Sequence, residues 1–188
     1  MLPLFETIAI ENGKVQNIEL HQQRYERSLR TFYGKSAVVF QKLFSLIEPP
    51  AEFQQGLVRC RIDYDAQHCQ VRYFTYQRKT YRTFQPVICN EIDYSLKYSQ
   101  RDVLNALFAQ RGECDEIIII KNGKVTDCSI GNLILRQGEQ WFTPDSPLLY
   151  GTQREKLLRE GKIIAREILA ENLPHFDEIR LINALNGL

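Results

Sequence analysis

The chain has 188 residues, enough for one domain or two small ones with a substantial buried core. Hydrophobic residues make up 44% and charged residues 25%, as in an ordinary globular protein, and the net charge of +1 gives no electrostatic case for binding nucleic acid or an anionic membrane. No apolar run reaches the length of a membrane span, and the N-terminal segment lacks the basic region of a signal peptide.

Cysteine and histidine usage favours neither a disulfide framework nor a metal centre. The five cysteines are scattered, odd in number and without CxxC spacing, which favours free thiols in a reducing cytoplasm. The three histidines, His21, His68 and His175, stand far apart and form no ligand pair at helical spacing. We therefore expect no metal.

The first half of the chain predicts two helices among several strands. Strands are expected at residues 4–10, 15–20, 56–64, 69–76 and 84–92. Apolar residues at helical spacing predict a helix over 21–33, which Gly34 stops. Ser36 can cap a second helix that reaches Ile47.

A hairpin in the second half is the strongest local signal. Ile117 to Ile120 predict a buried strand, and Asn122-Gly123 predicts a type I′ turn because both of its central residues need positive φ. Val125 begins the return strand. One acidic residue, Asp127, follows this apolar run. A carboxylate there must be satisfied locally or face a partner, and we expect a partner.

The remaining elements are two short helices and two strands. Asp102 can cap a helix over 103–110, and Thr152 can cap one over 153–159. Beyond Gly161 the pattern allows either a helix continuing to Asn172 or a break and a strand around 163–168, and we favour the break. A last strand is expected at 179–183.

These elements indicate a mixed α+β protein. We expect a small N-terminal domain over residues 1–85 and a larger, strand-rich domain over 86–188. The irregular segment 93–101 is the expected hinge.

Four features could carry chemistry. Arg24 lies near the start of the first helix, Lys97 in the irregular segment, and Asp127 after the hairpin; Thr152-Gln153 opens a later helix. A pyridoxal 5′-phosphate (PLP) site needs a lysine for the aldehyde, a carboxylate for the pyridine nitrogen, and a cation with a helix N-terminus for the phosphate. Residue types alone do not select this interpretation, because each feature also fits a solvated side chain, a turn or a helix start.

Six ordered motifs resemble those of the fold-type IV PLP enzymes, the class IV aminotransferase family. They are Phe5-Glu6-Thr7-Ile8 with Glu11-Asn12-Gly13, His21-Gln22-Gln23-Arg24 with Ser28, Lys97 with Arg101, Asp115-Glu116 with the run Gly123 to Asn132, Thr143-Pro144 with Gly151-Thr152-Gln153-Arg154, and Asn183-Ala184-Leu185. Together they span most of the chain. The spacing of Lys97 and Arg101 and the Asn-Ala-Leu run resemble the lyase branch, which includes 4-amino-4-deoxychorismate lyase.

The resemblance implies a fold and a set of roles. The fold is that of D-amino-acid aminotransferase, with a small α/β domain and a larger pseudo-barrel domain. Lys97 would bind the cofactor covalently and move protons, and Asp127 would pair with the pyridine nitrogen. The resemblance implies that the phosphate is held by Arg24, Thr152, Gln153 and the backbone of Ala184. Asn132 would hold the loop after Asp127.

The chain departs from the family pattern in three places. Asp127 stands where the family mostly has glutamate, and Ala9 replaces a common arginine. The chain also begins almost at the first motif, so its small domain is truncated at the start relative to the family.

The resemblance implies an enzyme acting on a small amino substrate as a cytoplasmic homodimer. One reaction would form 4-aminobenzoate and pyruvate for folate synthesis. The alternatives are transamination of a branched-chain or D-amino acid, and a non-catalytic relative that binds the cofactor or a partner.

Overall fold

The computed structural model describes residues 2–34 and 39–188, and its mixture of helices and sheets confirms the expected α+β class. Two compact units form. The first contains the chain up to Arg78 together with Leu96–Gln100, and the second contains Lys79–Ser95 and Arg101–Leu188. The expected division at residue 85 falls inside a strand of the second unit. Among the described residues, no helix has the length and apolar character needed to cross a membrane.

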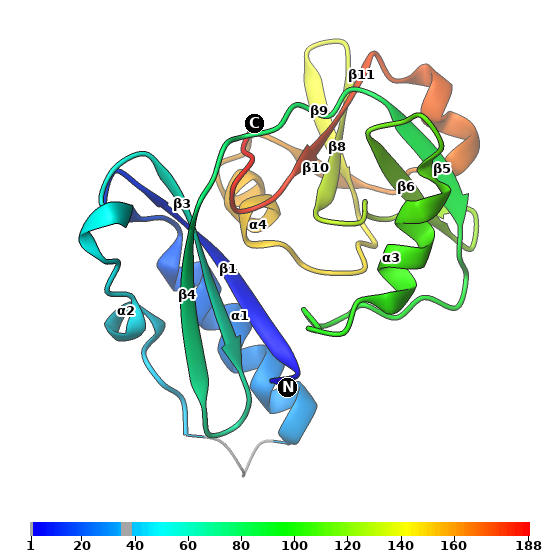
Figure 1. The fold of residues 1–188 in the computed structure, drawn as a ribbon. Coiled ribbons are helices and arrows are strands. Elements are labelled where there is room, and N and C mark those ends of the chain that lie inside the picture. The colour runs from blue at the N-terminus through cyan, green and yellow to red at the C-terminus, as the bar shows by residue number, and fades with distance from the viewer. Residues whose placement is uncertain (1, 35–38) are drawn as a thin grey trace. The chain divides into compact units, whose positions relative to one another are not determined.

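The first unit is a four-stranded antiparallel sheet with one long helix on it (Figure 1). Its strands, in the order β2-β1-β3-β4, are β1 (Leu4–Glu11), β2 (Lys14–Val15), β3 (Leu57–Tyr64) and β4 (Cys69–Thr75). Its helices are α1 (Ile18–Tyr33), α2 (Leu43–Leu46) and the 3-10 turn η1 (Ala51–Phe53). Tyr25 and Leu29 of α1 pack on Ile8 and Ile62 of the sheet.

Two predicted elements of this unit are wrong in extent. The return strand expected over 15–20 stops at Val15, because Asn17 adopts a left-handed φ of 51° and the chain enters α1 at Ile18. The second predicted helix shrinks to the four residues of α2, and its expected cap, Ser36, lies outside the described residues. The side chain of Gln22 in α1 bonds to this segment: it donates to the Gln41 carbonyl at 3.0 Å and accepts from the N–H of Leu43, the first residue of α2, at 2.8 Å.

The second unit contains two sheets. In one, β5 (Phe84–Ile88) runs parallel to β6 (Glu116–Lys121), which pairs antiparallel with β7 (Lys124–Val125). The other has the order β10-β9-β8-β11, with β8 (Asn132–Gln137), β9 (Gln140–Pro144), β10 (Ile164–Arg166) and β11 (Glu178–Ile182). Its helices are α3 (Asp102–Phe108), η2 (Ala109–Arg111), α4 (Thr152–Arg159) and η3 (Ala170–His175).

The local signals in this unit are mostly confirmed. Asn122 and Gly123 have φ of 52° and 78°, as the type I′ turn requires. Helix α4 ends before Gly161, whose φ is 67°, and a strand follows. The strand predicted over 84–92 is shorter than expected. Asp102 and Thr152 are the first helical residues, not caps.

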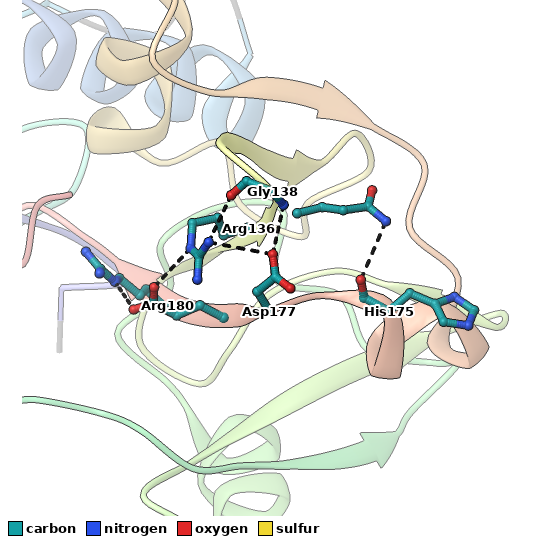
Figure 2. A network of polar contacts seen from close by, with 7 residues as sticks. Arg136, Gly138, His175, Asp177 and Arg180 are labelled. Atoms are coloured by element: carbon teal, nitrogen blue, oxygen red, sulfur yellow. Dashed lines mark hydrogen bonds and ion pairs between the residues drawn. The ribbon is translucent and has the colours of Figure 1, made fainter.

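A charged network fixes the register of β11 on the β8–β9 hairpin (Figure 2). Arg136 of β8 donates to the Gly138 carbonyl at 2.9 Å and pairs with Glu178 at 3.3 Å. Asp177 accepts from the Gly138 N–H at 2.8 Å and lies 3.6 Å from Arg136. The turn of the hairpin therefore holds the start of β11, whose far end reaches the loop described next.

Candidate active site

Asp127 is a buried carboxylate in the loop between β7 and β8. Its side chain is 4% exposed. One oxygen accepts from the side-chain amide of Asn132 at 2.8 Å, and the other accepts from the backbone N–H of Leu149 at 2.9 Å. Burial raises the pKa of Asp127 to about 7, and these donors and the charge of Arg154 only partly oppose that rise. Across the described residues, no basic side chain lies within ion-pair distance of Asp127.

Asn132 clamps this loop. Its amide nitrogen also donates to the Leu149 carbonyl at 2.8 Å, so it joins Asp127 to the segment before α4. The expectation that Asn132 holds the loop is confirmed. Two glycines permit the close packing: a Cβ at Gly151 would lie 2.0 Å from the Asn132 Oδ1, and one at Gly131 would lie 2.4 Å from the Ile182 carbonyl oxygen.

The start of α4 and a tight turn after β11 lie beside that loop. Thr152 is buried and Gln153 partly buried at the helix N-terminus, and backbone N–H groups at such a terminus can bind an anion. In the turn, Asn183 Oδ1 accepts from the N–H groups of Leu185 and Asn186, both at 3.0 Å.

The turn that contains Ala184 also reaches the helix. A Cβ at Gly187 would lie 3.5 Å from the side-chain nitrogen of Gln153. The second unit thus gathers four of the predicted residues on adjoining segments: Asp127, Thr152, Gln153 and Ala184.

Arg154 has a structural task in the same region. Its Nε donates to the Thr143 hydroxyl at 3.3 Å, and its Nη2 donates to the Pro144 carbonyl at 2.8 Å. Thr143 in turn donates to the Leu133 carbonyl at 2.9 Å. The two motifs Thr143-Pro144 and Gly151 to Arg154 are therefore in direct contact, and their contact anchors α4 on β9.

Lys97 and Arg24 belong to the first unit. The Lys97 carbonyl accepts from the Phe5 N–H at 3.0 Å, and its ammonium lies 4.7 Å from the centre of the Phe5 ring. This backbone bond fixes Lys97 to the first residues of β1. Lys97 is also close enough to lower the pKa of His21, after the larger effect of burial.

Arg24 lies in a buried ion pair that was not among the sequence-based predictions. Its Nε donates to Glu6 at 2.8 Å, its Nη2 donates to the other oxygen of Glu6, and His21 lies 2.6 Å from Glu6. Burial opposes the ionisation of Glu6, but the charge of Arg24 and the bonds from His21 and Arg24 outweigh it and lower the pKa to about 2.

A signal for this pair existed in the sequence. Positions 21, 24, 25, 28 and 29 share one helical face, and three of them are polar. Glu6, an acid between the apolar residues Phe5 and Ile8 of β1, is the matching partner. The expected site residues therefore form two sets, Lys97 and Arg24 in the first unit and the other four in the second.

Comparisons with known proteins agree with this architecture. Residues 95–188 match the family model described as amino-transferase class IV. An uncharacterized protein from Haemophilus influenzae is 70% identical over the full length of both chains. A crystal structure from Haemophilus somnus, of a protein with the provisional name 4-amino-4-deoxychorismate lyase, is 57% identical and covers 100% of this chain and 98% of that one, with a TM-score of 0.95.

A more distant structure shares the fold. It is a hypothetical aminotransferase from Mycobacterium tuberculosis in its PLP-bound form, 17% identical over 97% of this chain and 78% of that one, with a TM-score of 0.71.

Proposed function

Because the chain belongs to the class IV aminotransferase family, a group of PLP-dependent aminotransferases and lyases, we propose that it is a lyase that forms 4-aminobenzoate and pyruvate from 4-amino-4-deoxychorismate. The 57% identity to the provisionally named lyase of Haemophilus somnus supports the reaction. The buried carboxylate of Asp127 is the observation that carries the cofactor assignment.

Asp127 fits a protonated pyridine nitrogen. Its oxygens accept from the Asn132 amide and the Leu149 N–H, and an ionised carboxylate has further acceptor positions. Burial alone makes its negative charge costly, as the pKa of about 7 reflects, and a cation from the ligand would remove that cost. Asn132 and Leu149 hold the carboxylate in one orientation.

The phosphate-binding residues follow from the same logic. The N–H groups of Thr152 and Gln153 lie at the positive end of α4, and Ala184 offers a backbone N–H in the adjoining turn. Arg24 would supply the cation. Glu6 fixes the guanidinium of Arg24 through two of its nitrogens, so that its direction is set before a ligand binds.

Lys97 would bond to the cofactor and act as the proton carrier. When bound, the cofactor supplies an aldehyde that an amine can attack and a ring that withdraws electrons from the neighbouring carbon. Lys97 Nζ would take a proton from the substrate carbon that bears the amine and deliver one to the departing pyruvate. The bond from the Phe5 N–H to the Lys97 carbonyl fixes the backbone from which this side chain extends.

Product analysis tests the reaction. PLP-loaded protein is given 4-amino-4-deoxychorismate and, separately, a panel of L- and D-amino acids with a 2-oxo acid acceptor. Release of 4-aminobenzoate supports the lyase. Amino-acid turnover without 4-aminobenzoate would assign the protein to the aminotransferases.

Covalent attachment tests Lys97. After borohydride reduction, mass spectrometry should find the cofactor on the peptide that contains Lys97. Lys97→Ala should lose both this adduct and the visible absorbance, whereas Lys14→Ala, an exposed lysine of the same unit, should keep them. No visible absorbance in loaded wild type, and no difference from Lys97→Ala, would instead support a non-catalytic relative.

The proposal includes a cytoplasmic homodimer. All five cysteines are unpaired, which supports a reducing compartment. The homodimer comes from the family resemblance, and light scattering after size-exclusion chromatography measures it directly.

A further inference from the structure

A pocket of about 530 Å³ lies within the second unit. Its walls come from the segment before β5, from α3 and η2, from the start of β6 and from the loop that follows Asp127. We propose that this pocket binds the carboxylate of a small organic anion through Arg101 and Arg111. Identifying this anion with the lyase substrate rests on the proposed function.

Three cations line the pocket: Lys79, Arg101 and Arg111. Within the described ranges, none of them has a carboxylate at ion-pair distance. Arg101 instead donates to the Ser129 carbonyl at 2.8 Å, and Arg111 donates to the Phe108 carbonyl at 3.4 Å. Carbonyl groups orient a guanidinium without neutralising it, so the positive charge remains available to a ligand.

The two acids that line the pocket, Asp115 and Glu116, accept hydrogen bonds from other groups. Asp115 accepts from the N–H groups of Arg82 and Thr83 at 2.8 and 3.0 Å. Glu116 is 1% exposed and accepts from the Ser129 hydroxyl at 2.9 Å. Burial raises the pKa of Glu116, and hydrogen bonds from Ile117 and Ser129 and the charge of Arg101 partly oppose that rise. Both acids therefore accept hydrogen bonds within the wall of the pocket, and neither forms an ion pair with the three cations.

The pocket also offers flat apolar surface. The Arg111 Cζ lies 4.3 Å from the centre of the Phe108 ring. Tyr81 and Ile130 also line the pocket. The volume falls within the range of sites for small molecules. Cations beside an aromatic wall suit a ring that bears a carboxylate.

Arg101 links the pocket to the candidate active site. The carbonyl that it binds belongs to Ser129, two residues beyond Asp127 in the same loop. An anion held by Arg101 therefore lies against the loop that positions the proposed cofactor carboxylate. Both products of the proposed reaction are carboxylic acids, so their precursor presents the group that these arginines bind.

Direct binding tests the pocket without relying on turnover. Isothermal titration measures the affinity of 4-aminobenzoate for wild-type protein and for variants. We expect Arg101→Gln and Arg111→Gln to weaken binding about tenfold or more, the loss of a hydrogen bond to a charged group. Arg101→Lys should fall between them and wild type because it keeps the charge but not the fork. Arg82→Gln, a neighbouring exposed arginine outside the lining, is the matched control.

Two further readouts keep the outcomes distinct. Because Arg101 also holds Ser129, melting temperature is recorded for each variant, and Lys79→Gln, at an exposed position, gives a third reading that does not depend on that bond. The proposed anion site would be refuted if 4-aminobenzoate did not bind, or if wild type, Arg101→Gln and Arg111→Gln bound it with equal affinity. If binding depends on these arginines but the protein releases no 4-aminobenzoate from 4-amino-4-deoxychorismate, the proposed function is refuted and the anion site is still supported.

Discussion

Replacing Glu6 by glutamine leaves Arg24 charged and without its carboxylate inside the first unit. Both side chains are at most 6% exposed, so water cannot take over the lost partner. Breaking a buried ion pair in this way costs about 3–5 kcal/mol of unfolding free energy. The lowered pKa of Glu6 gives a free energy of similar size: the change from 4.5 to about 2 corresponds to about 3 kcal/mol.

The lowered pKa of Glu6 also predicts how its contribution to stability changes with pH. A carboxylate whose folded-state pKa is lowered stabilises the fold fully above its unfolded pKa of about 4.5, and this contribution is lost as the pH falls toward 2. The difference in unfolding free energy between wild type and Glu6→Gln should therefore be constant above pH 5 and shrink below pH 4.5. Urea unfolding followed by far-UV circular dichroism measures it at each pH.

Glu11→Gln is the matched control. Glu11 lies on the same strand and pairs with Arg78 at 3.1 Å, but both side chains are about half exposed, so its loss should cost at most about 1 kcal/mol. The reasoning fails if Glu6→Gln costs no more than Glu11→Gln, or if its cost is the same at pH 3 and pH 7.

Three further outcomes are expected in the second unit. Gly131→Ala places a Cβ 2.4 Å from the Ile182 carbonyl oxygen and should lower the unfolding free energy, measured in urea, by about 2 kcal/mol or more. Gly138→Ala is the control and should cost about 1 kcal/mol, because only its φ of 61° is unfavourable for alanine. The pKa of Asp127 is raised from 3.8 to about 7, so the unfolding free energy of cofactor-free protein should fall as the pH rises through this range. A flat pH profile in wild type, or the same fall in Asp127→Asn, would contradict the raised pKa of this carboxyl. Asn132→Ala frees the Asp127 carboxylate and should weaken PLP binding at least tenfold in equilibrium titrations, whereas Asn172→Ala, on η3, should leave it unchanged.

Local chemistry explains what the sequence predicted well. Asn122-Gly123 defines its turn through two positive φ values that few other residues tolerate, and Gly161 ends α4 for the same reason. The role of Asn132 came from the family resemblance, and the structure gives its physical basis: the side-chain amide donates to the buried carboxylate of Asp127.

Contacts between distant segments explain what it did not predict. Residues 39–42, just before α2, are not helical, and Gln41 there accepts a hydrogen bond from Gln22, about twenty residues earlier. Glu6 and Arg24 also meet across the interface of a strand and a helix, a pairing that neither local pattern contains. The need for glycine at 131 and 151 becomes evident only once the atoms that they approach are known, the Ile182 carbonyl and the Asn132 side chain. The pocket around Arg101 likewise requires the full set of its four segments.

The pairing of β11 with β8 sets an order for folding. Asn132 opposes Ile182, so the partners are far apart in the chain, and closing that loop costs entropy before the contact is gained. The hairpin of β6 and β7 can form early from neighbouring residues, but the Asp127 loop packs through Gly131 on the end of β11. We therefore expect the carboxylate to become ordered in a late step of folding, so that an intermediate with most of its secondary structure would not yet bind the cofactor.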